Sequence, residues 1–141
     1  MFKAFLIDPV AQAITEVEFN GDYREIYKLI DASLFTTVAI TEDDAIFVDD
    51  EGLLQDGQRF FMVEGYPQPL AGHGLVLGCD DEGETVAPRI SLSELKRRIS
   101  WARPDLRLAG FEPVSGTVDT PFGPAEAFGH RPVFTTEPEQ E

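Results

Sequence analysis

Apolar residues in this chain occur in short runs separated by turn-forming residues, and these runs predict a series of β-strands. The first run covers residues 2–8 and ends at an Asp-Pro step, and the second covers residues 14–19. Short apolar runs bounded by turn signals are typical of buried strands. Further strands are predicted over 34–40, 45–48, 59–63 and 75–78. The connections are mostly short, which favours antiparallel pairing because parallel strands need long crossovers.

In two other segments the spacing of the residues predicts an α-helix and not a strand. Over residues 22–32, apolar side chains recur at i, i+3, i+4 and i+7, and Asp22 precedes them as a predicted N-cap. Over residues 91–102, Ser91 and Glu94 have the spacing of a capping box. Trp101 at the end of this second helix is expected to cover the edge of the core or to stack on a base.

Together these elements predict an α+β fold with a mostly antiparallel sheet of about six strands and two helices, over 22–32 and 91–102. The domain is expected to cover residues 1–104. Residues 105–141, rich in Pro and Gly, are expected to form an extension that packs partly on the domain and frays over 135–141. A length of 141 residues and a hydrophobic content of 43% suit one such domain.

The composition excludes several classes of function. With 26 acidic and 11 basic residues the net charge is −15, which disfavours direct binding to nucleic acid or to an anionic membrane. A single cysteine, Cys79, excludes an internal disulfide, and two histidines with it make a zinc site improbable. No cofactor and no metal site are expected. The apolar runs are too short for a signal peptide or a membrane span, so a cytoplasmic protein is expected.

Three stretches carry a resemblance to a known group of proteins: Asn20-Gly21-Asp22-Tyr23-Arg24-Glu25-Ile26-Tyr27, the segment from Ile46 to Leu53, and the Gly-rich segment from Gly65 to Gly78. They are similar to small uncharacterised proteins of bacteriophages and mobile elements, and to a phage-associated domain family of unknown function. The resemblance covers about residues 1–100. It implies an accessory role and brings no catalytic residues with it.

Carboxylates are concentrated in two bands that flank predicted strands. If the strands over 45–48 and 75–78 are neighbours, both acidic turns could lie at one end of the sheet. Solvated turns, a phosphate-mimicking surface and a divalent-cation site are the three interpretations, although the spacing is not that of a calcium loop. The predicted acidic surface comprises Glu42, Asp43, Asp44, Asp49, Asp50, Glu51, Asp80, Asp81 and Glu82.

Two further groups of residues are candidates for binding. Lys96, Arg97 and Arg98 form a basic patch in the second helix, where cations offset the helix dipole or bind an acidic partner. The Gly-rich loop is either a demanding sheet connection or the wall of a pocket for a nucleotide-like ligand. The hypothetical ligand-binding residues are Arg59, Tyr66, Gly72, His73 and Gly74.

No serine lies in a Gly-x-Ser-x-Gly elbow, and Cys79 precedes two aspartates that disfavour its thiolate. The sequence therefore predicts a non-enzymatic accessory protein that binds a host protein through its acidic surface, as a nucleic-acid mimic or an anti-defence inhibitor. The alternative is a small-ligand-binding domain that uses the loop over 65–78. A metal-dependent enzyme is the third hypothesis. A homodimer formed through an open sheet edge or the second helix is a further hypothesis.

Overall fold

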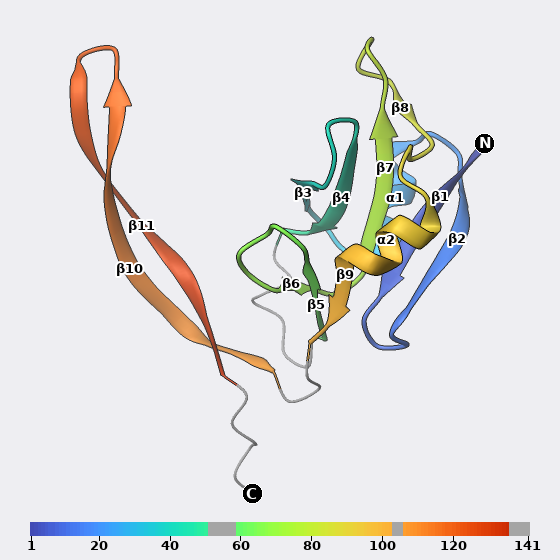
Figure 1. Ribbon diagram of the computed structural model, residues 1–141, viewed down its shortest axis with the longest axis horizontal. Coiled ribbons are helices and arrows are strands. Elements are labelled where there is room, and N and C mark those ends of the chain that lie inside the picture. The colour runs from blue at the N-terminus through green and yellow to red at the C-terminus, as the bar shows by residue number, and fades with distance from the viewer. Residues whose placement is uncertain (51–58, 103–105, 136–141) are drawn as a thin grey trace, which may run out of the picture. The chain divides into compact units, whose positions relative to one another are not determined.

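A computed structural model describes residues 1–50, 59–102 and 106–135. The chain divides into two compact units, Met1–Pro104 and Asp105–Glu141. The described part of the first unit contains α1 (Tyr23–Ile30), α2 (Leu92–Arg98) and nine strands (Figure 1). The strands are β1 (Phe2–Asp8), β2 (Ala13–Phe19), β3 (Phe35–Ala39), β4 (Asp44–Asp49), β5 (Phe60–Val63), β6 (Leu70–Ala71), β7 (Gly74–Cys79), β8 (Thr85–Val86) and β9 (Ile99–Trp101).

The first unit is built on a six-stranded sheet in the order β2-β1-β7-β4-β3, with β8 paired to β7. Every pairing in this sheet is antiparallel. A smaller antiparallel sheet has the order β6-β5-β9. The predicted α+β class is therefore confirmed. Five of the six predicted strands lie in the main sheet, and the sixth, over 59–63, corresponds to β5 of the small sheet. The main sheet also contains β8, which was not predicted, and β6, β9 and the two strands of the C-terminal hairpin are further additions among the described residues.

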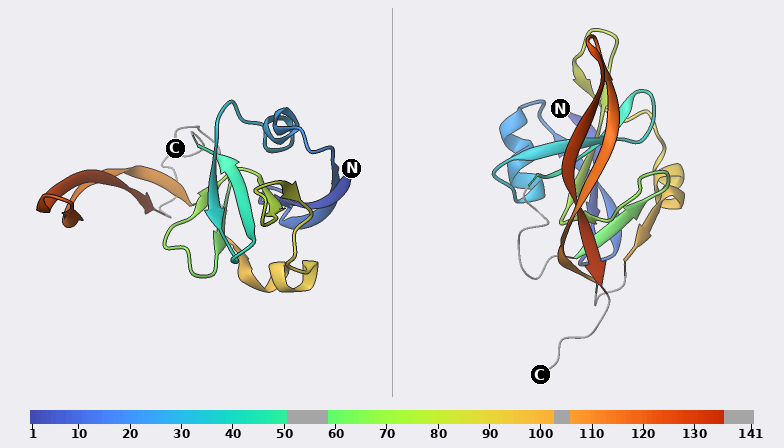
Figure 2. Two further views of the ribbon diagram at one scale, coloured as in Figure 1. Left: turned by 90° about the horizontal axis from the view of Figure 1, so that it is seen from above. Right: turned by 90° about the vertical axis from the view of Figure 1, so that its left-hand side faces the viewer.

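The central strand β7 is covered on both faces. Leu75 and Leu77 pack in one cluster with Ile26 and Ile30 of α1. Val76, which points to the opposite face, belongs to a second cluster that includes side chains of α2 and of the small sheet. The two helices accordingly lie on opposite sides of the main sheet (Figure 2). This double coverage explains why β7 reads as a continuous apolar run in the sequence.

Helix α1 begins where the sequence predicts. Asp22 is its N-cap, and the carboxylate accepts a hydrogen bond from the backbone N–H of Arg24 at 3.0 Å. The helix ends at Asp31, whose φ of 54° lies in the left-handed region. A residue in that conformation commonly ends a helix because its N–H turns back onto the last carbonyls. The last helical residue is Ile30, two residues before the predicted end at residue 32.

Helix α2 also begins as predicted, with the Ser91 hydroxyl accepting from the N–H of Glu94 at 3.1 Å. The prediction that it continues to residue 102 is wrong, because it ends at Arg98. The chain then becomes β9, which pairs with β5, so that Trp101 lies opposite Phe61. A β-branched residue, Ile99, starts this strand and is buried.

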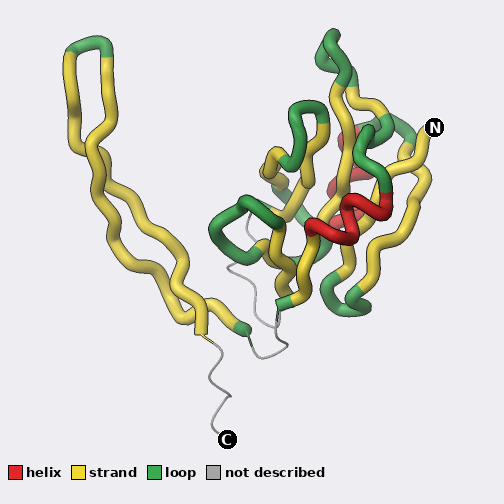
Figure 3. Tube along the Cα trace, in the orientation of Figure 1, coloured by secondary structure: helices red, strands yellow, loops and turns green. Residues whose placement is uncertain are grey.

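The second unit is a β-hairpin of β10 (Arg107–Thr120) and β11 (Gly123–Thr135), whose two strands are yellow in Figure 3. Strands of 14 and 13 residues are more than the Pro- and Gly-rich composition of this segment predicted. Thr135 pairs with Arg107, so the predicted fraying does not begin at residue 135, and residues 136–141 lie outside the described residues. The predicted packing of this segment on the domain stays a prediction.

Candidate functional site

The acidic turns are arranged by the pairing of β4 with β7. These strands are neighbours, as the sequence analysis supposed, and Asp44 lies opposite Gly78. Because the strands are antiparallel, the start of β4 meets the end of β7. Glu42 and Asp43 therefore lie at the same end of the sheet as the 80–84 turn, whereas Asp49 lies at the far end of β4. The carboxylates between Glu42 and Asp50 are thus divided between the two ends of the sheet.

Asp44 is not part of a surface, so its prediction as a surface carboxylate is wrong. Its side chain is 3% exposed. One carboxylate oxygen accepts from the N–H of Arg89 at 2.9 Å, and the other accepts from the N–H of Ile90 at 2.8 Å. A buried charge needs such donors to offset its desolvation. Asp44 therefore fastens the segment before α2 to the main sheet.

Asp49 and Asp50 are also separated from the rest of the predicted surface. Asp49 is only 9% exposed at the end of β4, opposite Phe35. Its assignment to an exposed surface is wrong for the same reason as that of Asp44. Asp50 is exposed, and its N–H donates to the carbonyl of Leu34 at 3.1 Å, which keeps it at the opposite end from the 80–84 turn. Glu51 lies outside the described residues.

The carboxylates that do share one end of the sheet are ordered by backbone hydrogen bonds. One carboxylate oxygen of Asp80 accepts from the N–H groups of Glu82 and Glu84, both at 2.9 Å. The N–H of Cys79 donates to the carbonyl of Asp43 at 2.8 Å, which ties one turn to the other. We call this group the acidic sheet end. It consists of Glu42, Asp43, Asp80, Asp81, Glu82 and Glu84.

One cation lies against the acidic sheet end. The guanidinium of Arg89 reaches the carboxylate of Asp43 at 3.2 Å. Both side chains are substantially exposed, so this ion pair contributes little to stability. Among the described residues no group of three or more His, Cys, Asp or Glu side chains could hold a metal ion.

The residues predicted to bind a ligand in the Gly-rich loop make several contacts within the first unit. The His73 ring nitrogen Nε2 lies 3.4 Å from the Asp8 carboxylate, and the N–H of Gly72 donates to the carbonyl of Arg59 at 2.9 Å. A Cβ on Gly74 would lie 2.8 Å from Ile46 Cγ2, so glycine is required there for close packing. Tyr66 packs against the larger core cluster. The interpretation of this loop as a demanding sheet connection is the one these contacts support.

The three cations of the basic patch have different surroundings. Arg97 forms an ion pair with Glu94, one turn earlier on α2. Arg98 donates to the backbone carbonyl of Ile40 and thereby links α2 to the main sheet. Lys96 is exposed and has no ion pair or hydrogen bond within the described ranges 1–50, 59–102 and 106–135. Only Lys96 of the three thus has an unengaged charge in this part of the chain.

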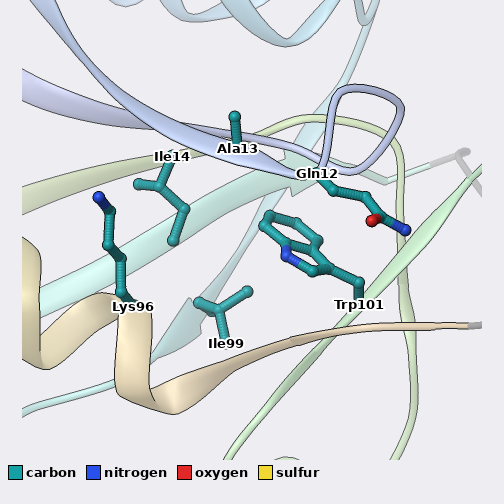
Figure 4. A pocket seen from close by; sticks show the side chains of 6 residues that line it. All are labelled: Gln12, Ala13, Ile14, Lys96, Ile99 and Trp101. Atoms are coloured by element: carbon teal, nitrogen blue, oxygen red, sulfur yellow. The ribbon is translucent and has the colours of Figure 1, made fainter.

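Lys96 lines a pocket that the sequence analysis missed. The pocket has a volume of about 360 Å³ and lies between the β1–β2 turn and the segment from α2 into β9 (Figure 4). The side chain of Trp101 was the one signal in the sequence, but its partners come from a turn far away in the chain. The residues lining the pocket are Gln12, Ala13, Ile14, Lys96, Ile99 and Trp101.

Comparisons with known proteins show a family. The family described as "Domain of unknown function (DUF3846)" matches residues 2–99. The uncharacterized protein y4iR of Sinorhizobium fredii (strain NBRC 101917 / NGR234) is 29% identical over 124 residues, covering 85% of this chain and 74% of the relative. Protein PsiB of Rhizobium leguminosarum bv. phaseoli is 32% identical over 104 residues, covering 74% of each chain. No solved structure matches.

The resemblance to a domain family of unknown function is therefore confirmed, over nearly the range that the sequence analysis gave. The matched range ends within β9, so it covers the main sheet, both helices and the acidic sheet end. The hairpin of β10 and β11 lies outside it. In the described part of the chain no helix is both long and apolar enough to cross a membrane.

Proposed function

Because the chain belongs to the DUF3846 family, whose function is unknown, we propose a function from its surface chemistry: it is a binding protein that engages a basic surface of another protein. The observation that carries this proposal is the position of the acidic sheet end. Two turns far apart in the sequence, around Asp43 and Asp81, lie together because β4 and β7 pair antiparallel. Six carboxylates thereby act on a partner from one place.

The acidic sheet end suits rapid, electrostatically steered association. Asp80 fixes its own turn through two backbone hydrogen bonds, so little ordering is needed when a partner binds. The net charge of −15 attracts a basic partner over a range set by the Debye length and repels nucleic acid itself. A partner that normally binds nucleic acid through a basic groove has the complementary chemistry.

This proposal places the chain as a non-enzymatic accessory protein of a phage or mobile element, with a host protein as its target. The same charge pattern would serve a nucleic-acid mimic or an inhibitor of a defence system. Carboxylates held on ordered turns can occupy positions that phosphates take on a basic protein. The proposal requires no catalytic group and no cofactor.

A charge-matched pair of variants tests the proposal. In the first variant the acidic sheet end is neutralised by Glu42→Gln, Asp81→Asn and Glu82→Gln. In the control the same number of exposed carboxylates is neutralised elsewhere, by Glu18→Gln, Asp50→Asn and Glu64→Gln. Proteins captured from bacterial lysate by the unmodified chain are compared with those captured by each variant, and the affinity of any purified partner is measured against salt.

The expected result is a partner that the control still binds and that the first variant binds at least about tenfold more weakly, a loss of about 1.4 kcal/mol. Binding of the unmodified chain should also weaken steeply as salt rises. Equal binding by the two variants would show that the position of the neutralised carboxylates does not matter. An affinity that does not change with salt would exclude electrostatic attraction between the chain and its partner. Either result removes the acidic sheet end as the binding surface.

A further inference from the structure

The pocket between the β1–β2 turn and α2 has the chemistry of a ligand site that is independent of the acidic sheet end. Among the described residues that line it, the ammonium of Lys96 is the single ionisable group. Since Arg97 and Arg98 are engaged by Glu94 and by the carbonyl of Ile40, Lys96 is the cation of α2 left to meet an anion within the described residues. The pocket therefore selects for negative charge at this position.

The rest of the lining selects for a flat apolar body. Trp101 is half-buried against the larger core cluster and presents its indole to the pocket (Figure 4). Ile14 and Ile99 are 8% and 7% exposed, so their side chains form a fixed apolar wall. Lys96 lies at one end of the pocket and Trp101 at the other, with Ile99 between them. An aromatic ring can stack on the indole in an offset or edge-to-face arrangement, which adds to the free energy gained by burial alone.

The size and charge of the pocket narrow the ligand further. A volume of about 360 Å³ is near the lower limit for small-molecule sites, which span roughly 300–1,000 Å³. One ammonium offsets one negative charge, whereas a nucleoside diphosphate or triphosphate would carry several into a protein of net charge −15. The carboxamide of Gln12, close to the Trp101 end, offers both a donor and an acceptor to a ring substituent.

From these features we propose that the pocket binds a small aromatic monocarboxylate. The carboxylate lies at Lys96, the ring stacks on Trp101, and a polar ring substituent meets the Gln12 amide. This ligand class differs from the nucleotide-like ligand that the Gly-rich loop suggested. The site also uses no residue of the acidic sheet end, so it stands whether or not that surface binds a protein.

Trp101 is the single tryptophan of the chain, so its fluorescence reports on the pocket directly. The unmodified protein is titrated with benzoate and 4-hydroxybenzoate, with neutral benzamide and with adenosine monophosphate. The expected result is a saturable change with the two carboxylates, tighter for 4-hydroxybenzoate, and at least about tenfold weaker binding of benzamide. Lys96→Gln should lower the benzoate affinity about tenfold and leave that of benzamide unchanged.

Arg97→Gln is the matched control, because it removes one cation from the same helix outside the pocket and should not change benzoate binding. Thermal denaturation of each variant checks folding, and a benzoate-induced rise in Tm provides a second readout. The proposal is overturned if no aromatic carboxylate gives a saturable change up to about 10 mM. It is equally overturned if benzamide binds as well as benzoate, if adenosine monophosphate binds most tightly, or if both variants behave alike.

Discussion

The two units of this chain bury their large apolar side chains to opposite extents. In the first unit Phe61, Leu75 and Leu95 are fully buried. In the hairpin of β10 and β11, Phe122 and Phe128 are 101% and 78% exposed. Burial of a large side chain contributes about 1.5–3 kcal/mol, so the same residue type has different consequences in the two units. The first unit is specified by its core, whereas the hairpin is specified by its backbone ladder and turn.

The stability of the hairpin rests on the pairing of its two strands. Its register is regular from Gly110 to Thr120, and Glu112 forms a cross-strand ion pair with Arg131. Such exposed pairs contribute little, and a two-stranded hairpin is at best marginally stable in water. We therefore expect the free energy of unfolding to depend mainly on the first unit, and substitutions in the hairpin to leave it nearly unchanged.

The largest expected effect comes from truncating matched phenylalanines. Phe61→Ala should lower the free energy of unfolding by about 3–5 kcal/mol, because it opens a cavity where β5 faces the main sheet. Phe128→Ala should change it by less than about 0.5 kcal/mol. Urea denaturation followed by far-UV circular dichroism measures both. A similar loss from both variants would show that the hairpin contributes to the same cooperative core.

The next effect concerns a carboxylate. Asp44→Ala should cost about 2–3 kcal/mol, because the N–H groups of Arg89 and Ile90 lose their acceptor. The matched hairpin variant is Glu126→Ala, which removes an exposed carboxylate and should have an effect within about 0.5 kcal/mol. Hydrogen exchange at Ile90 gives a local readout, since its amide should lose protection in Asp44→Ala. Unchanged protection there would contradict the fastening role of Asp44.

Substitution of one glycine in each unit should show the same contrast in stability, with a smaller loss of unfolding free energy. Gly74→Ala should destabilise the protein by about 1–3 kcal/mol, because its Cβ would lie 2.8 Å from Ile46 Cγ2 and 2.9 Å from Phe61 Cζ. Gly116→Ala in β10 meets nothing within 4 Å and should be neutral or slightly stabilising. The melting temperatures of the two variants measure this difference in stability. Equal melting temperatures would mean that the side chains around Gly74 adjust to an added Cβ at little cost.

The smallest effect depends on pH. The hydrogen bond from the Arg24 N–H lowers the pKa of the Asp22 carboxyl below its ordinary value. A lowered pKa in the folded state stabilises the protein above the unfolded-state pKa, and this contribution is lost as the pH falls through the folded-state value. Asp22→Asn keeps an oxygen acceptor but cannot titrate. In urea denaturation below about pH 4, its stability should fall less with decreasing pH than that of the unmodified chain.

Local signals predicted a large part of the fold. The strand over residues 2–8 has the predicted bounds, and α1 and α2 begin at the predicted caps, Asp22 and Ser91. These features depend on contacts within a few residues, so a single sequence contains the necessary information. The acidic turn after β7 was also located correctly, since Asp80 forms its hydrogen bonds within that turn.

The features that could not be predicted depend on partners remote in sequence. The end of α2 was misplaced because Trp101 pairs with Phe61 in β9, and helical spacing alone does not reveal that pairing. The sequence around Asp44 is that of an ordinary turn, and the burial of this residue follows only from its hydrogen bond with the distant N–H of Ile90. The pocket likewise needs the β1–β2 turn, with Gln12, to face α2, with Lys96. Such contacts follow from the topology and not from the local pattern.

The central position of β7 has a consequence for synthesis on the ribosome. The β1–β2 hairpin contains only local contacts and can form early, but β1 finds its second neighbour only when Leu75 emerges to meet Leu6. Until then one edge of β1 is open, and β4 also lacks its inner neighbour. Nascent chains of this fold therefore depend on late closure of the sheet, and slow translation between β4 and β7 would prolong exposure of edges prone to aggregation.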